Sequence, residues 1–404
     1  MLRCARVVRI LFLAQRVPYP PNRGDKITTW RLVERMRRRH EVRVVAFAHG
    51  EDDLAAAREL AAKGIPTTAI PYDRSRALVR SWPALLKGDP ITLHAYGSRQ
   101  LQRAVDEELA RGIELAYAYS SSMGAFLLPH AGQPWVMHFA ELDSDKWAQY
   151  AQQKRWPASW IYARESRLLL EFERRIAAVS RANVFCTGLE QSIFRERIPG
   201  RDSCVLRNGV DLEHFRPAPE LAEPGHIVFT GVMDYFPNVD ACEFFAREVL
   251  PSIRREHPEA RFSIVGSHPT AEVRALGNLP GVTVTGFVQD TRDWLARASV
   301  AVAPLRIARG IQNKVLEACA MGLPVVGSTC ATQGVEWRAE QGAAPFVVAD
   351  GAAATTAAVL ALLKDRAAAE KLGRSARTFV ESRYAWERCL DELDALLARC
   401  APTA

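Results

Sequence analysis

The chain has 404 residues, enough for two or three domains, and its 48% apolar and 25% charged residues are near globular averages, which excludes disordered, collagen-like and coiled-coil proteins. No apolar run reaches the roughly 18 residues that cross a bilayer, and no secretory signal is recognisable, so we expect a cytosolic protein. Eight cysteines without a C-x-x-C pair argue against a zinc ribbon, a thioredoxin motif and a disulfide framework.

The net charge of +7 is unevenly distributed. Residues 1–205 contain 32 Lys+Arg against 22 Asp+Glu, whereas residues 206–404 contain 21 against 24. A basic first half is compatible with nucleic acid, an anionic membrane or an anionic substrate, and equally with an ordinary solvated surface.

The first half alternates short apolar runs with amphipathic stretches. This pattern predicts helices over residues 27–39, 52–63 and 162–178, and strands over 7–14, 42–48, 66–70, 115–118, 136–139 and 183–186. The second half repeats the alternation. Its predicted helices are 239–249, 271–276, 291–298 and 312–321, and its predicted strands are 227–230, 262–265, 282–285, 300–303 and 324–327.

Strands that alternate with helices form parallel sheets with crossover helices. Ten or more strands exceed one typical domain, and the Pro-rich stretch at 206–224 marks a break. We therefore expect two doubly wound α/β domains, residues 1–205 and 206–404, with the last helix (about 380–400) packing back on the first domain.

The loop P-Y-P-P-N-R-G-D-K, residues 18–26, directly follows the first predicted strand. Ligands of open parallel sheets bind where strands end. Gly24 permits a close backbone approach, and Arg23 and Lys26 supply positive charge, so the loop is either an anion cradle or a polar connection. It is not a dinucleotide fingerprint, because G-x-G-x-x-G is absent.

The segment R-I-A-R-G-I-Q-N-K-V-L-E, residues 306–317, follows a second-half strand. We expect a helix that begins near Ile311, just after Gly310. Its N-terminus would be an anion site surrounded by Arg306, Arg309 and Lys314. Lys314 and Glu317 share one face of this helix, and the alternative is an internal Lys–Glu pair on a core helix.

Two further strand ends carry polar residues. In G-V-M-D-Y-F-P-N-V-D, residues 231–240, Gly231 begins the loop and Asn238 is a candidate helix cap; a turn without a ligand fits as well. In H-F-A-E-L-D-S-D-K-W, residues 138–147, His138 and three acids form either a catalytic edge or capping and surface residues.

Basic and large apolar residues interleave in R-S-R-A-L-V-R-S-W-P-A-L-L-K, residues 74–87. Such a segment can lie in the headgroup layer of a membrane, or it is a surface helix packed on the first domain.

Several of these motifs resemble a known family. N-G-V-D at 208–211, G-F-V-x-D at 286–290 and K-V-L-E-A-x-A-M-G-L-P-V-V at 314–326 are similar to the GT-B glycosyltransferases of the large retaining family GT4. N-R-G-D-K, D-S-D-K-W and A-R-G-I-Q-N-K more closely resemble the sugar transferases associated with exosortase and PEP-CTERM systems. The resemblance implies two Rossmann-like domains facing across a cleft, with the acceptor on the first and the nucleotide-sugar on the second.

By this resemblance Glu317 holds the nucleotide ribose, since it matches the second Glu of the family's E-x7-E motif. The first Glu is replaced here by Arg309, and the usual Arg and Lys after the first strand of the second domain are absent; Val232 and Asn238 lie there. The diphosphate is therefore assigned to Lys314, Arg309 and the other cations named above.

The remaining implied contacts are on both domains. His138 matches a strand-end position near the donor sugar, and we group it with Arg309 and Lys314 as catalytic. Phe287 and Val288 match the segment that packs on the nucleobase, and Gly310 with Ile311 forms the start of the anion-binding helix.

We therefore predict a hexosyltransferase that moves a sugar, with retention, from a nucleotide-diphosphate sugar to a glycan or lipid-linked acceptor in exopolysaccharide biosynthesis. It would need no cofactor or metal and bind no nucleic acid, and it would work in the cytoplasm, with a possible site at the inner face of the membrane. The alternatives are a sugar-nucleotide 2-epimerase of the same fold and a non-catalytic sugar-binding protein.

Overall fold

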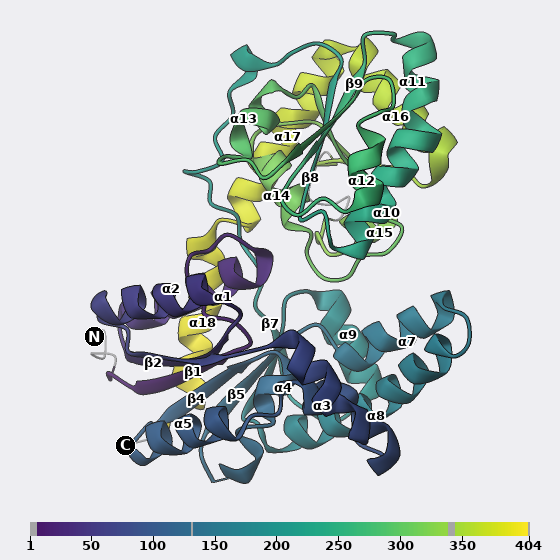
Figure 1. The fold of residues 1–404 in the computed structure, drawn as a ribbon. Helices are drawn as coiled ribbons and strands as arrows, with labels where there is room; N and C mark the ends of the chain where they lie inside the picture. The colour runs from purple at the N-terminus through teal and green to yellow at the C-terminus, as the bar shows by residue number, and fades with distance from the viewer. Residues whose placement is uncertain (1–5, 131, 338–343, 403–404) are drawn as a thin grey trace. The chain divides into compact units, whose positions relative to one another are not determined.

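The computed structural model describes residues 6–130, 132–337 and 344–402, and its ribbon is drawn in Figure 1. The chain divides into two compact units. Unit 1 comprises Met1–Arg207 together with Leu390–Ala404, and unit 2 comprises Asn208–Cys389.

Unit 1 is built on a seven-stranded parallel sheet with the order β3-β2-β1-β4-β5-β6-β7. The strands are β1 (Arg9–Ala14), β2 (Glu41–Ala48), β3 (Thr67–Pro71), β4 (Leu115–Tyr119), β5 (Trp135–Ala140), β6 (Ala182–Phe185) and β7 (Ser203–Val205). The helices are α1 (Gly24–Arg37), α2 (Glu51–Ala62), α3 (Arg74–Lys87), α4 (Ile91–Tyr96), α5 (Arg99–Ala110), α6 (Ser121–Gly124), the 3₁₀ turn Leu128–His130, α7 (Asp143–Gln153), α8 (Ala158–Val179) and α9 (Gly188–Arg197).

The central strand β1 shows why this sheet forms. Ile10, Leu11, Phe12 and Leu13 are completely buried, because helices cover both faces of the sheet. Leu11 and Leu13 belong to the same core cluster as Leu101 of α5. Parallel strands buried on both faces read as continuous apolar runs, which is the pattern visible in the sequence.

Unit 2 repeats the architecture with a six-stranded parallel sheet of order β10-β9-β8-β11-β12-β13. Its strands are β8 (His226–Thr230), β9 (Arg261–Val265), β10 (Val282–Gly286), β11 (Val300–Ala303), β12 (Val325–Gly327) and β13 (Val347–Val348). Its helices are the 3₁₀ turn Pro219–Leu221, α10 (Phe236–Phe244), the π turn Phe245–Val249, α11 (Leu250–Glu256), α12 (Ala271–Leu276), α13 (Arg292–Arg297), α14 (Asn313–Ala320), α15 (Thr329–Thr332), α16 (Gly351–Lys364) and α17 (Arg366–Arg383).

The predicted fold, two doubly wound α/β units, is confirmed. In each sheet the strand order reverses once, between β1 and β4 in unit 1 and between β8 and β11 in unit 2. Ligands of doubly wound sheets bind beside such switch points, at the carboxyl ends of the strands. The sequence motifs at residues 18–26 and 231–240 directly follow β1 and β8, so both lie at these ends.

Several local boundaries differ from the predictions; for example, the helix predicted over residues 162–178 begins earlier, at Ala158. The helix predicted over residues 239–249 begins at Phe236 and loosens into a π turn after Phe244. The helix expected near Ile311 begins at Asn313. The short edge strands β7 and β13 were not predicted, because two or three residues carry too little periodicity to be recognised.

The last helix, α18 (Trp386–Cys400), belongs to unit 1 from Leu390 onward. There the guanidinium of Arg35 in α1 pairs with Asp391 at 2.8 Å and with Asp394 at 3.0 Å. No helix in the described part of the chain is long and apolar enough to cross a membrane.

Candidate functional site

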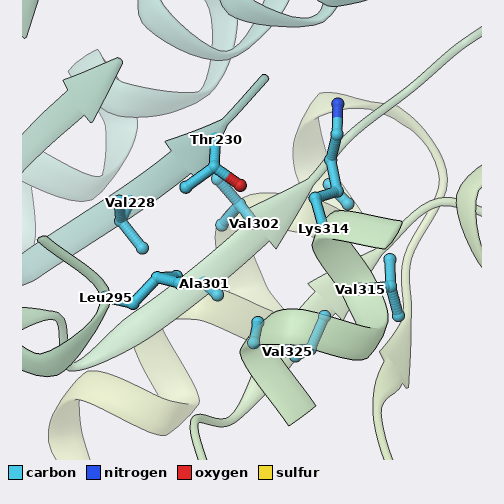
Figure 2. Close-up of a pocket in the computed structure, with 10 residues that line it drawn as sticks. Val228, Thr230, Leu295, Ala301, Val302, Lys314, Val315 and Val325 are labelled. Carbon is cyan, nitrogen blue, oxygen red and sulfur yellow. The ribbon is translucent and has the colours of Figure 1, made fainter. Parts of the chain in front are cut away.

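Polar side chains of unit 2 gather at the carboxyl end of β8. Gly231 directly follows this strand, Asn238 lies in the first turn of α10, and Lys314 and Glu317 come from α14. Figure 2 shows Lys314 at the start of α14 and Thr230 at the end of β8, on the same side of a small pocket whose other labelled residues are apolar. Lys314, Asn238 and Gly231 therefore meet at the switch point of the second sheet, and Glu317 lies on the same helix as Lys314.

The Lys314 ammonium is held from two sides. Its Nζ donates a hydrogen bond of 2.5 Å to Oδ1 of Asn238 and lies 4.2 Å from the centre of the Phe229 ring. Burial of the ammonium lowers the pKa of Lys314 to about 8, although the charge of Glu317 opposes this shift. The group is therefore mostly protonated at pH 7 and loses its charge within the range of ordinary assays.

Glu317 lies one turn further along α14. Burial raises the pKa of its carboxyl group to about 7, with Lys314 acting in the opposite direction. Among the described residues, no side chain or backbone group donates a hydrogen bond to this carboxylate. A carboxylate with free acceptor positions beside an ammonium suits a ligand that carries both hydroxyl groups and negative charge.

Asn238 was a candidate helix cap in the sequence, but the structure places it inside α10. Helix α10 begins two residues earlier, and the Asn238 side chain instead links two segments. Its Nδ2 donates a 2.8 Å hydrogen bond to the carbonyl of Val232, while its Oδ1 accepts from Lys314. The residue thus ties the loop after β8 to α14.

Gly231 and Gly266 allow the loops after β8 and β9 to approach each other closely. A Cβ atom at Gly231 would lie 2.7 Å from Nδ2 of Asn238 and 3.2 Å from Nζ of Lys314. A Cβ atom at Gly266, which follows β9 and has φ +153°, would lie 1.6 Å from the carbonyl oxygen of Gly231. Only glycine fits at Gly266, so the two loops that border the site pack backbone against backbone.

Hydrogen bonds accepted by its carbonyl groups hold the loop before α14 in place. The carbonyl of Leu305 accepts from Ser328 at 2.5 Å, that of Ala308 from Gln333 at 3.2 Å, and that of Arg309 from Gln312 at 2.9 Å. These three hydrogen bonds hold the loop in one conformation.

Backbone geometry fixes the same loop. Gly310 adopts φ +61°, the left-handed region that favours glycine, and a Cβ atom at Gly334 would lie 2.0 Å from the carbonyl oxygen of Gly310. Ile311 is half-buried and packs against the core of unit 2. The start of α14 therefore has little freedom to move.

Arg306 is partly neutralised within the chain. Its guanidinium forms a two-pronged ion pair with Asp240 of α10, and it lies 5.4 Å from the centre of the Phe244 ring. The Asp240 carboxylate raises the pKa of Arg306 further. Of the cations predicted around the helix start, Lys314 thus approaches the end of β8, whereas Arg306 is committed to an acid.

The predicted nucleobase segment is the loop after β10. The Phe287 side chain is 79% exposed, so its ring is open to a planar ligand. Val288 is half-buried and packs against the core of unit 2, which anchors the loop.

His138 lies inside the core of unit 1. This residue lies in β5 with no exposed surface, its Nδ1 is 2.7 Å from the Tyr117 hydroxyl, and its Nε2 is 3.7 Å from the Cys186 sulfur. Burial lowers the pKa of His138 to about 3, so the ring is neutral. The structure thus shows His138 as a neutral, buried residue of the core, and its role near the donor sugar stays a prediction.

The loop after β1 is only partly the anion cradle that the sequence indicated. Lys26 is 7% exposed, and its Nζ pairs with Asp53 at 2.6 Å, so its charge is used inside unit 1. Arg23 remains half exposed at the start of α1, where its Nε lies 3.3 Å from Asp25. Gly24 is the first residue of that helix.

Asp240, Gly266 and Gly334 were not recognised from the sequence as parts of the site. Gly266 ends the run S-I-V-G directly after a predicted strand, which was a usable signal for close backbone approach. The roles of Asp240 and Gly334 depend on contacts with residues distant in the sequence, Arg306 and Gly310. No cluster of three or more His, Cys, Asp or Glu residues that could hold a metal ion occurs in the part of the chain that the structure describes.

Two known protein families match this chain. Residues 24–209 match the family described as "Glycosyl transferase 4-like domain", and residues 224–365 match "Glycosyl transferases group 1". The two matches fall on the two units and together cover most of the chain. The chain is a glycosyltransferase with a group 1 domain at residues 224–365. The predicted enzyme class is thereby confirmed at the level of the family.

A curated relative gives the same assignment over part of its length. This glycosyltransferase is 27% identical to the glycogen synthase of Mycobacterium tuberculosis over 244 residues. The match covers 57% of this chain and 57% of the relative, so the chain spans little more than half the length of that protein.

Solved structures share the fold of this glycosyltransferase. The sucrose-phosphate synthase of Thermosynechococcus elongatus superposes with a TM-score of 0.72 at 16% identity, covering 96% of this chain and 98% of that one. The Anabaena protein HepE, in complex with UDP and glucose, gives 0.68 at 15% identity, covering 97% and 99%. At these identities the similarity establishes the GT-B fold, and the predicted fold class is confirmed.

Proposed function

We propose that this protein transfers a hexosyl group from a nucleoside-diphosphate sugar to a glycan or lipid-linked acceptor. The observation that carries the proposal is the placement of Lys314 and Glu317 on the same helix, α14, with the Lys314 ammonium at the carboxyl end of β8. Lys314 would meet the diphosphate and Glu317 the ribose hydroxyl groups. The Anabaena protein with the same fold was solved with UDP-glucose, which supports a donor of this class.

The chemistry follows from these groups. As the glycosidic bond breaks, negative charge grows on the leaving diphosphate, and a fixed ammonium and loop N–H groups stabilise that charge. The anomeric carbon passes through an oxocarbenium-like state, as in other glycosyl chemistry. By the family resemblance we propose a retaining reaction in which the donor phosphate itself takes the acceptor proton, so we assign no protein base.

The proposed division of labour follows the two units. Unit 2 would bind the donor and unit 1 the acceptor. By the same resemblance we place the reaction in exopolysaccharide assembly associated with exosortase and PEP-CTERM systems, in the cytoplasm.

The direct test is a release assay with purified protein and a panel of nucleoside-diphosphate sugars, in the presence and absence of lipid-linked saccharides. We expect nucleoside diphosphate to appear in an acceptor-dependent manner and a glycosylated lipid to form in equal amount. Release that is independent of any acceptor would instead indicate the epimerase.

Metal dependence is a separate prediction. Because side chains and loop N–H groups supply the positive charge, EDTA should leave the initial rate within about twofold of the untreated rate. The measurement is turnover at saturating donor with EDTA and then with added Mg²⁺ or Mn²⁺. Activity lost with EDTA and restored by either ion would contradict the proposed mechanism.

Helix α3 supports an acceptor held in a membrane. Its small residues Ala77, Ser81 and Ala84 face the protein and are buried. Four of its five large apolar residues are exposed instead: the exposed fractions are 64% for Leu78, 71% for Val79, 68% for Trp82 and 93% for Leu86, whereas Leu85 is half-buried. An ordinary surface helix buries its large apolar residues, so this face fits a partner outside the chain.

The basic residues of α3 indicate what kind of surface its exposed apolar face binds. Arg74, Arg76, Arg80 and Lys87 lie on the same helix, so the surface is apolar with a basic border. We propose that it rests in the headgroup layer of an anionic membrane, where apolar side chains insert and cations meet lipid phosphates. The guanidinium of Arg164 in α8 donates to the carbonyl of Ala84 at 2.7 Å and ties α3 to the unit.

Vesicle binding tests this proposal. Co-sedimentation should occur with vesicles containing phosphatidylglycerol and not with pure phosphatidylcholine, and it should weaken with salt, since each Lys or Arg near such a surface contributes roughly 1 kcal/mol. Leu86→Asp should reduce binding strongly, whereas Val348→Asp, at a half-exposed position in unit 2, should not. Equal binding to both vesicle types, or none, would reject the membrane contact.

A further inference from the structure

Asn238 makes two hydrogen bonds that leave its amide no freedom to turn. The residue is 6% exposed. Its Nδ2 donates to the Val232 carbonyl at 2.8 Å, and its Oδ1 accepts from Nζ of Lys314 at 2.5 Å. Because the backbone carbonyl can only accept, the amide must present its oxygen to the ammonium.

Two further neighbours restrict the position of the ammonium. The Phe229 ring lies 4.2 Å from Nζ, and Gly231 is so near that a Cβ atom there would stand 3.2 Å from Nζ. A lysine side chain has four rotatable bonds and rarely holds one position on a protein surface. Here β8, its following loop and α10 each restrict the same nitrogen.

We propose that Asn238 is a positioning residue that fixes the Lys314 ammonium at the carboxyl end of β8, so that the donor diphosphate meets a charge already in place. This inference rests on the proposed donor site. A neutral amide suits the task better than a carboxylate would, because it holds the ammonium without cancelling its charge.

The charges around Lys314 are few. Glu317 on the same helix is the acid that acts on it, and the Cys242 thiol faces it from α10. Burial raises the pKa of Cys242 to about 12, so the thiol is neutral in the assay range. The nearby Arg306–Asp240 pair is internally balanced. A change at Asn238 should therefore be visible in the titration of Lys314.

Two variants separate positioning from a merely structural role. Asn238→Ala and Asn238→Asp both remove the N–H donor to Val232, so a residue that only braced the loop would respond equally to both. The two variants should have opposite effects on the pKa of Lys314. Alanine removes the hydrogen-bond acceptor of the ammonium, whereas aspartate places a negative charge beside the ammonium.

The readout is the pH dependence of Lys314 acetylation, followed by mass spectrometry, with the exposed Lys364 as internal control. In the wild type the reactivity should rise with a midpoint near pH 8. The midpoint should move lower in Asn238→Ala and higher in Asn238→Asp, while that of Lys364 stays constant. Thermal melting confirms folding, and Asn238→Ser replaces the alanine variant if that protein does not fold.

Binding of inorganic pyrophosphate, measured by calorimetry at pH 7, completes the test. Pyrophosphate carries the diphosphate without a base or sugar. Its Kd should rise roughly three- to tenfold in Asn238→Ala, the size expected for one ordinary hydrogen bond. It should also rise in Asn238→Asp, because the added carboxylate cancels the charge of Lys314.

The outcomes are distinguishable. A Lys314 midpoint that is the same in all three proteins would overturn the positioning role. Midpoints that separate, together with an unchanged affinity for pyrophosphate, would keep Asn238 as the residue that holds Lys314 and would instead contradict the proposed donor site.

Discussion

Lys314→Ala is expected to lower both kcat and kcat/KM for the donor by about 10- to 150-fold. A charge-assisted hydrogen bond contributes roughly 1.5–3 kcal/mol, and its loss slows a step by this factor if the bond strengthens as the diphosphate leaves. The ammonium already lies at the end of β8, held by Asn238, so its effect should be expressed in the transition state.

The assay is steady-state kinetics with circular dichroism as a check on folding. Lys364→Ala is the matched control, since it removes a lysine of unit 2 that pairs only with Glu256 among the described residues. Glu317→Gln should act mainly on KM, because it keeps one acceptor oxygen for the ribose. Wild-type rates for a folded Lys314→Ala would remove Lys314 from the mechanism.

Gly266→Ala should be the most destabilising single substitution near the site. Its Cβ atom would lie 1.6 Å from the Gly231 carbonyl oxygen, and alanine would have to adopt φ +153°. Overpacking costs about 1–3 kcal/mol and an unfavourable backbone conformation about 1–2 kcal/mol, so we expect unfolding to become easier by about 2–5 kcal/mol. In a unit of this size the Tm should fall by roughly 5–15 °C.

Gly351→Ala is the control for this substitution. That glycine also has a positive φ of +78°, yet an added Cβ atom would meet nothing within 4 Å. Its Tm should fall by only about 2–8 °C, the share of the backbone conformation alone. Calorimetric melting of the two variants checks the account, and equal shifts would show that the contact between the two loops is not tight.

Much of the fold could be read from the sequence because its signals are local. Buried parallel strands appear as apolar runs such as the one ending at Ala14, and the helices between them show their own period. The positions of Lys314 and Glu317 on one helical face follow from their spacing of three residues. The strand order and the switch points come from the structure, because the general rules for alternating β and α elements allow more than one order.

The parts that could not be predicted depend on partners distant in the sequence. Lys26 reads as a free cation beside a glycine, and only the fold brings Asp53 to it. Arg306 is likewise committed to Asp240, 66 residues away. His138 reads as a residue at a strand end, but the strands on both sides and Tyr117 enclose it completely. The sequence around a charged residue does not show which distant residue it pairs with in the fold.

The most direct test of the central claim is a calorimetric titration of nucleoside diphosphates (UDP, GDP, ADP and dTDP) into the wild-type protein, Lys314→Ala and Lys364→Ala. The account predicts that at least one of them binds the wild type and Lys364→Ala with equal affinity. It predicts a Kd at least about tenfold higher for Lys314→Ala, since one charge-assisted hydrogen bond is lost. Equal affinity for Lys314→Ala, or no binding of any nucleoside diphosphate to the wild type, would contradict a donor site at the start of α14.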